Sequence, residues 1–185
     1  DHVLLKSRGR EFEWERRGDE YWVTMPDPDW ESDRIANNKQ RDANSTPPIV
    51  SRKVMLITGS HILQTYWVLS LEGQHREGRK LRQFPWLYFI QEKRWIPNED
   101  SFLTPPGGPP LFEVWDHSCI NCHSVAGKPG FNLQTGFTNS RVAELGIACE
   151  ACHGPGKRHV LFHQRNENEK AGSDFGHSDP IFHPA

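Results

Sequence analysis

Residues 119–123 read Cys-Ile-Asn-Cys-His, and residues 149–153 repeat the pattern as Cys-Glu-Ala-Cys-His. These two motifs contain all four cysteines of the chain. In each motif, two thiols three positions apart can form thioether bonds to the vinyl groups of one porphyrin, and the adjacent histidine can ligate the iron. The sequence therefore predicts two covalently bound haems of the c type. The residues assigned to them are the cysteines Cys119, Cys122, Cys149 and Cys152 and the proximal ligands His123 and His153.

Three other uses of paired cysteines fit the pattern less well. Four thiolates can bind zinc, but residues 123–148 form a longer connection than such sites usually have, and a zinc site of this kind needs neither histidine. A thioredoxin-like redox pair needs one such motif at a junction of strand and helix, not two. A disulfide within Cys-x-x-Cys closes a small strained loop and is a poor structural link.

The composition agrees with a chain that packs around a flat apolar group. Hydrophobic residues make up 35% of the 185 residues and charged residues 25%, which by itself resembles a loosely folded protein. Seven Trp and ten Phe argue against disorder. The formal net charge of -2 gives no sign of nucleic-acid binding, and no stretch approaches the roughly 18 apolar residues of a membrane span.

The N-terminal half predicts β-structure. Apolar side chains alternate with polar ones over residues 12–25, interrupted by Arg-Gly-Asp-Glu at 17–20, which is typical of a β-hairpin. Pro85 in a later aromatic run predicts an edge strand or a bend. Further strand candidates cover residues 49–58, 62–71 and 81–90.

A run of Pro and Gly at residues 105–110 predicts a boundary, and a helix is predicted beyond it over residues 141–153, with Ser140 as its N-cap. The expected fold class is α+β with much irregular structure. In this fold, a β-hairpin-rich N-terminal half covers a haem-binding C-terminal half with few short helices. The predicted parts are a β-rich covering region at 1–110, a dihaem region at 111–165 and an extended tail at 166–185.

Four segments resemble a known family: Gly59-Ser60-His61 with Gln64 and Tyr66-Trp67, Arg94-Trp95-Ile96-Pro97, the motif at 119–123, and residues 146–156 followed by His159. They resemble the exported multihaem c-type cytochromes related to the nitrifier tetrahaem cytochrome, some of which carry tetratricopeptide repeats. The resemblance covers roughly residues 50–160. It implies a second histidine as distal ligand of each haem, and it places His61 and His159 in that role. Members usually have a further haem motif upstream, whereas this chain has two in all.

Other histidines remain alternatives for the distal positions. His163 lies one helical turn beyond His159. His117 is too close to Cys119 to reach over its own haem but can reach the other one. Bis-His ligation predicts a lower reduction potential than ligation by Met and His.

Three functions remain open at this point. The first is an electron carrier that relays electrons between redox partners through two closely spaced haems, and this function is favoured over an enzyme. The second is a haem enzyme or enzyme subunit with one open-site haem acting on a small nitrogen or oxygen compound. The third function is a haem-bearing subunit of a larger complex or filament.

The expected partners are other redox proteins or haem-bearing subunits, in an oligomer or a larger complex. Because haem c is attached outside the cytoplasm in bacteria, we expect an exported protein of the periplasm or the cell exterior. A chain that begins at Asp1 rather than Met also predicts a signal peptide or a longer segment upstream.

Overall fold

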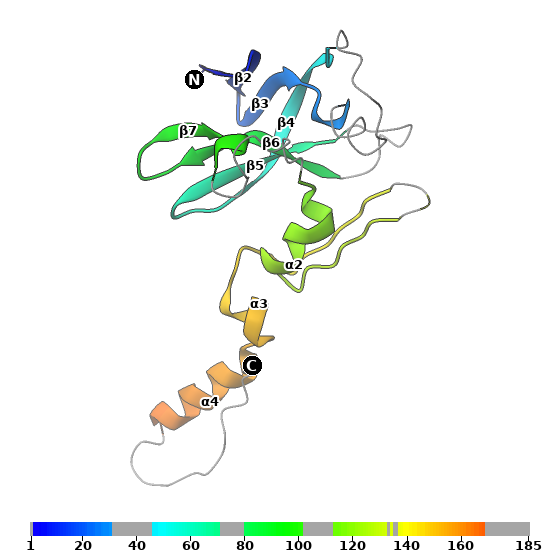
Figure 1. The fold of residues 1–185 in the computed structure, drawn as a ribbon. Helices are drawn as coiled ribbons and strands as arrows, with labels where there is room; N and C mark the ends of the chain where they lie inside the picture. Colours follow the sequence, from blue (N-terminus) through cyan, green and yellow to red (C-terminus); the bar gives the residue numbers. More distant parts are fainter. Residues whose placement is uncertain are drawn as a thin grey trace.

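A computed structural model describes residues 2–30, 46–70, 80–101, 113–132, 134 and 137–168 of the chain. Its largest element is a seven-stranded antiparallel sheet in which neighbouring strands follow the order of the chain (Figure 1). The strands are β1 (His2–Ser7), β2 (Arg10–Arg17), β3 (Glu20–Pro26), β4 (Ile49–Thr58), β5 (Leu63–Leu69), β6 (Leu81–Phe89) and β7 (Arg94–Pro97). Short helical turns and a longer helix accompany the sheet. The turns are η1 (Asn98–Asp100), η2 (Trp115–Cys119), α2 (Ile120–Cys122) and α3 (Cys149–His153), and the helix is α4 (Lys157–Asn168).

The sheet curls back on itself into a barrel-like form. The ring of Phe12 on β2 lies 5.9 Å from the rings of both Phe84 and Trp86 on β6, measured between centroids. In a flat sheet, strands four places apart would be separated by about 19 Å. The two ends of the sheet also meet, because Ser7 donates a hydrogen bond to Glu99 (3.0 Å) and Arg8 pairs with Asp100 (3.2 Å).

The inner face of the curled sheet holds the main hydrophobic core. Alternate residues of β1 to β6 point inward, as the period of two in a strand requires. Trp95 of β7 packs against this cluster as well. The buried members are Leu5, Phe12, Trp14, Val23, Met25, Tyr66, Val68, Phe84 and Trp86.

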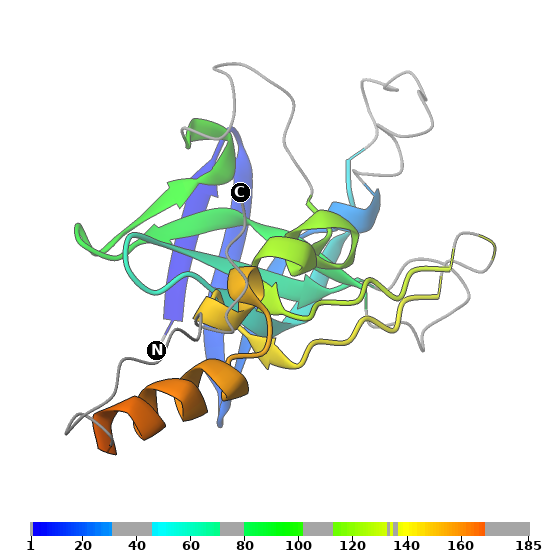
Figure 2. The same ribbon diagram turned by 90° about the horizontal axis from the view of Figure 1, so that it is seen from below.

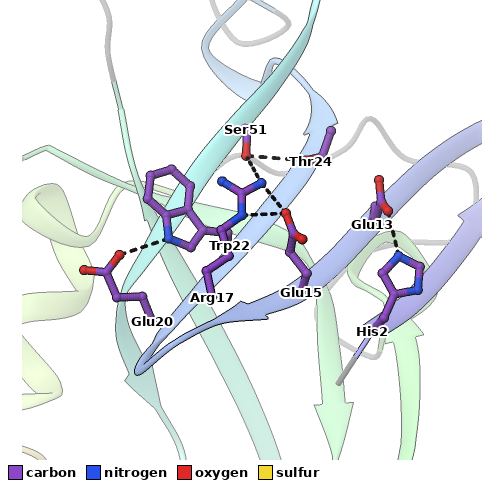
Figure 3. A network of polar contacts seen from close by, with 8 residues as sticks. All are labelled: His2, Glu13, Glu15, Arg17, Glu20, Trp22, Thr24 and Ser51. Carbon is purple, nitrogen blue, oxygen red and sulfur yellow. Dashed lines mark hydrogen bonds and ion pairs between the residues drawn. The ribbon is translucent and has the colours of Figure 1, made fainter.

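The outer face of the first strands is polar. Figure 3 shows Arg17 beside Glu15 and Ser51, and the indole N–H of Trp22 donating to Glu20 over 3.0 Å. Such exposed ion pairs contribute little to stability. They indicate that the outer face of β1–β3 is exposed to solvent.

The outer face around β5 is apolar instead, and the segment that contains the first cysteine motif packs on it. Trp67 of β5 packs edge-on against Trp115 of η2, with ring centroids 5.4 Å apart. Ile120 of α2 joins this second cluster and is 1% exposed. The segment with the first cysteine motif is therefore anchored on the outside of the sheet, away from the main core.

Hydrogen bonds to β6 fix the entry of this segment. The amide of Gln83 donates to the carbonyl of Glu113 (2.9 Å), and Arg82 forms a β-bridge with Val114. The buried carboxylate of Asp116 accepts a hydrogen bond from the amide of Leu81 (3.0 Å). The contacts lie where β7 no longer pairs with β6, so the chain takes over the free edge of that strand.

A two-stranded ribbon follows the first motif. Strands β8 (Ser124–Val125) and β9 (Glu144–Leu145) pair antiparallel, and isolated bridges extend the ribbon. These bridges join Lys128 to Arg141 and Phe131 to Thr138. Seen from below, the ribbon and the turns η2 and α2 lie over the outside of the sheet (Figure 2), whereas α3 and α4 extend away from it (Figure 1).

The predicted helix over residues 141–153 is wrong, because only Cys149–His153 is helical. The backbone of Arg141 exchanges hydrogen bonds with Lys128 across the ribbon. Gly146 has φ +101°, which ends any helical path. The apolar side chain of Val142 packs against the Trp67–Trp115 cluster instead of forming a helical stripe.

The expected α+β fold class is also wrong. The described part of the chain is strand-rich, and its haem-motif half is organised by an extended ribbon rather than by helices. The hairpin predicted at 12–25 is confirmed as β2 and β3, and the three further strand candidates are confirmed as β4, β5 and β6. Pro85 lies within an inner strand rather than at an edge, at a register irregularity opposite Thr65 and Trp67. The boundary predicted at 105–110 lies outside the described residues.

Candidate functional site

The first motif lies where η2 continues directly into α2. Cys119 ends η2 and is half-buried, whereas Cys122 and His123 are exposed. The amide of His123 donates to the carbonyl of Cys119 over 2.9 Å, which continues the helical path through the motif. Because Ile120 is buried between the two cysteines, the motif is held in place while Cys122 and His123 face outward.

Small residues after the motif make this close packing possible. The hydroxyl of the buried Ser124 donates to the carbonyl of Ile120 over 2.5 Å. A Cβ atom at Gly127 would lie 2.4 Å from that same carbonyl oxygen. A side chain at position 127 would therefore push the ribbon away from the motif.

The second motif lies on a separate single turn, α3. Cys149 and Cys152 are exposed, His153 is half-buried, and no residue of α3 is fully buried. Gly154 ends the turn with φ +74°, and its amide donates to the carbonyl of Glu150 (3.1 Å). The second motif thus depends on its neighbours in the chain far more than on the core.

The ribbon brings the two motifs together. The amide of Gly146 donates to the carbonyl of His123 over 3.1 Å. Cys149 is three positions beyond Gly146, so their Cα atoms lie within about 11 Å of each other. Residues far apart in sequence therefore become neighbours, although nothing in the spacing of the motifs predicted this pairing.

The helix α4 carries two of the candidate distal ligands. The carboxylate of Glu150 accepts a hydrogen bond from the amide of Gly156 over 2.5 Å, which ties the start of α4 to the second motif. His159 and His163 are one turn apart on this helix, and their ring centroids are 4.6 Å apart. They share one helix face, and the distal role of either stays a prediction.

His61 lies at the tip of the turn between β4 and β5, and it is exposed. Its Nδ1 is 2.9 Å from the hydroxyl oxygen of Ser60. Gly59 begins the turn with φ +87°, and a Cβ atom there would lie 2.0 Å from the carbonyl oxygen of Leu63. The ring of His61 is exposed and therefore accessible to a ligand.

His117 has a different environment from these histidines. Its ring packs edge-on against Phe131 of the ribbon, with centroids 4.8 Å apart. Partial burial lowers its pKa, and the nearby charge of Lys80 lowers it further. The neutral form that an iron ligand requires is therefore favoured at this position.

The cysteines suit covalent attachment of a haem. The structure describes all four, and none of them is in a disulfide bond. Large apolar side chains near the second motif are exposed, as expected of residues that a flat apolar group would cover. These are Leu145, Ile147, Val160 and Leu161. Within the described ranges, no three His, Cys, Asp or Glu side chains form a group that could hold a metal ion by themselves.

Sequence reasoning missed the Trp67–Trp115 contact that anchors the first motif. The available signal was β5 itself, which is apolar on both faces. A strand with one solvated face alternates in polarity, so two apolar faces indicate that something covers the outside.

One comparison with known proteins gives a partial match. Over 63 residues, the chain is 40% identical to the C-type polyheme cytochrome OmcC of Geobacter sulfurreducens. The stretch is 33% of this chain and 8% of that protein, so the chain spans a small part of its relative's length. No protein-family model and no solved structure matches the chain. No helix in the described ranges is long and apolar enough to cross a membrane. Part of the chain is thus similar to a polyhaem c-type cytochrome.

Proposed function

We propose that the chain is a c-type cytochrome that holds two haems and relays electrons between redox partners. The observation that carries the proposal is the bond between Gly146 and His123, because it holds two Cys-x-x-Cys-His motifs side by side, each with at least one exposed cysteine. The partial similarity to a polyhaem cytochrome supports the same assignment. A bound haem supplies one-electron chemistry at its iron.

The residues have distinct parts in this proposal. The thiols of Cys119 and Cys122 attach one haem and those of Cys149 and Cys152 the other. His123 and His153 are the proximal ligands. We assign the distal positions to His61 and His159, with His163 as the alternative on the same face of α4.

Exposed surface at the second motif supports a role in relaying electrons. An electron enters or leaves through a haem edge that a partner can approach. No residue of α3 is buried, and Leu145 and Ile147 next to it are 56% and 64% exposed. The partners we propose are other redox proteins or haem-bearing subunits, met in the periplasm or outside the cell.

The test is a haem count on protein made in a bacterial host that exports it and attaches haem c. A pyridine haemochrome assay and intact mass should both give two haems per unfolded chain, because thioethers survive unfolding. The double variants Cys119→Ser/Cys122→Ser and Cys149→Ser/Cys152→Ser should each retain one. A chain without covalent haem, or one whose count is unchanged by either double variant, would contradict the proposal.

A further inference from the structure

An open pocket lies on the outer face of the sheet near its β7 end. Its volume is about 460 Å³, and its apolar walls include Leu63 of β5, Phe89 of β6 and Ile96 of β7. Leu63 is paired directly with Phe89, and Ile96 is paired with Leu87 two positions before Phe89. These side chains therefore share one face of three neighbouring strands.

This face is the one on which the first motif rests. Leu63 and Trp67 are four positions apart on β5, so they point to the same side. Trp67 belongs to the cluster with Trp115 and Ile120, against which Cys119 packs. Four residues of a strand span about 13 Å. The pocket thus lies on the same face of the sheet as the cluster beside Cys119, with Thr65 between Leu63 and Trp67 on β5.

We propose that this pocket receives the porphyrin attached at Cys119 and Cys122. The inference rests on the proposed function, and it adds the wall against which the first haem lies. Porphyrin faces are flat and apolar, so packing against Leu63, Phe89 and Ile96 removes apolar surface from water. The thioether bonds limit how far this haem can lie from the cluster around Trp67. The pocket is an apolar recess on the same face of the sheet.

Charge at the rim supports the same occupant. Arg94 lines the pocket, with its guanidinium carbon 5.8 Å from the ring centroid of Phe89, and its Nε is paired with the exposed carboxylate of Glu92 in the turn before β7. A guanidinium is a strong partner for carboxylates such as the haem propionates. The other charged group of the lining, Asp100, is paired with Arg8 over 3.2 Å. Apolar walls with a cation at the rim match an apolar ring with an anionic edge.

The experiment measures reduction potentials in the haem-loaded chain with Arg94→Gln. We expect two haems by mass and a more negative potential for one of them, because removing a positive charge near a haem disfavours its reduced form. The Cys149→Ser/Cys152→Ser background, which keeps the first haem, should show the shift. The Cys119→Ser/Cys122→Ser background should not. Arg16→Gln is the matched control, since Arg16 is similarly exposed and lies on β2.

A second variant tests the apolar wall. Ile96→Trp fills part of the pocket, so the visible spectrum of the first haem should change while that of the second stays the same. The inference is overturned if Arg94→Gln and Ile96→Trp leave the potential and spectrum of the first haem equal to those of Arg16→Gln. Absence of covalent haem from the unmodified chain would instead contradict the proposed function, and the inference with it.

Discussion

The backbone amide of Gly146 donates a hydrogen bond to the carbonyl oxygen of His123 over 3.1 Å. His123 completes the first cysteine motif, and Gly146 lies three residues before the second. The two strands of the ribbon close at this bond. In the proposed cytochrome, this closure keeps the two haem-attachment sites close enough to exchange electrons.

Substituting Gly146 should weaken the ribbon. At φ +101°, an alanine is strained although the space around it is open, so Gly146→Ala should lower the free energy of unfolding by about 1–2 kcal/mol. Urea unfolding of the haem-loaded chain measures this. The control is Ala126→Gly, at a residue of the same ribbon with φ +48°, which should stay within about 0.5 kcal/mol of the unmodified protein. A free energy of unfolding for Gly146→Ala equal to that of the unmodified protein would show that the positive φ at Gly146 does not matter for stability.

Trp67 should be the main anchor of the first motif. It is 3% exposed, packs against Trp115 and donates its indole N–H to Thr58 over 2.9 Å. Trp67→Ala should therefore destabilise the protein by about 3–5 kcal/mol. The control, Trp22→Ala, removes a partly exposed ring under Arg17 and should cost about 1 kcal/mol. Chemical unfolding measures the free energy of unfolding of both variants. Similar losses in the two would show that the Trp67–Trp115 cluster contributes no more to stability than a partly exposed aromatic ring.

Tyr66 should make the protein sensitive to alkali. Burial raises the pKa of Tyr66 to about 12, with smaller contributions from Tyr88 and Tyr21. The unfolded chain releases this proton near pH 10 while the folded chain keeps it. Stability should therefore fall as pH rises from about 10 to 12, by on the order of 2 kcal/mol.

Thermal unfolding at several pH values tests this expectation. Tyr66→Phe should flatten the decline above pH 10, and Tyr21→Phe, at an exposed position, should retain it. A decline of the same size in Tyr66→Phe and the unmodified chain would assign the alkaline sensitivity to another group.

His61 should serve as a sixth ligand without affecting haem attachment. His61→Ala should keep two haems by mass but convert one to a high-spin or water-ligated state, because thioether formation depends on the cysteine motif alone. Visible spectra of the oxidised protein reveal this change. His2→Ala, at an exposed histidine paired with Glu13, is the control and should remain low-spin. An unchanged low-spin spectrum in His61→Ala would exclude this role for His61.

Most strands of the sheet were predictable because apolar residues, which point inward, alternate along them with polar residues, which point outward. Phe12 and Trp14 point inward between charged neighbours, and the period of two is visible without knowledge of the partner strands. β1 and β7 were not predicted, because both are short and the inward direction of their apolar residues is apparent only once the main core is known. The predicted helix over 141–153 was wrong because Val142 and Ala143 suit a helical stripe and a ribbon equally well. Pairing with residues 124–131 decided between the two.

The proposed haem attachment follows from local sequence alone. Cysteine spacing and the following histidine act within five residues, so the candidate haem sites needed no tertiary information. The distal ligands were not readable in this way. His61 and His159 lie on different elements, and which iron each could reach depends on how those elements pack.

By itself, the sequence determined the two attachment motifs and most of the strands, because both are encoded in contacts within a few residues of each other. Only the tertiary structure decided that the sheet curls, that Trp67 carries the first motif on its outer face, and that Gly146 meets His123. These features depend on contacts between residues far apart in the chain, such as Phe12 with Phe84. Such contacts form only when the burial of apolar surface outweighs the entropy of closing the loops between them.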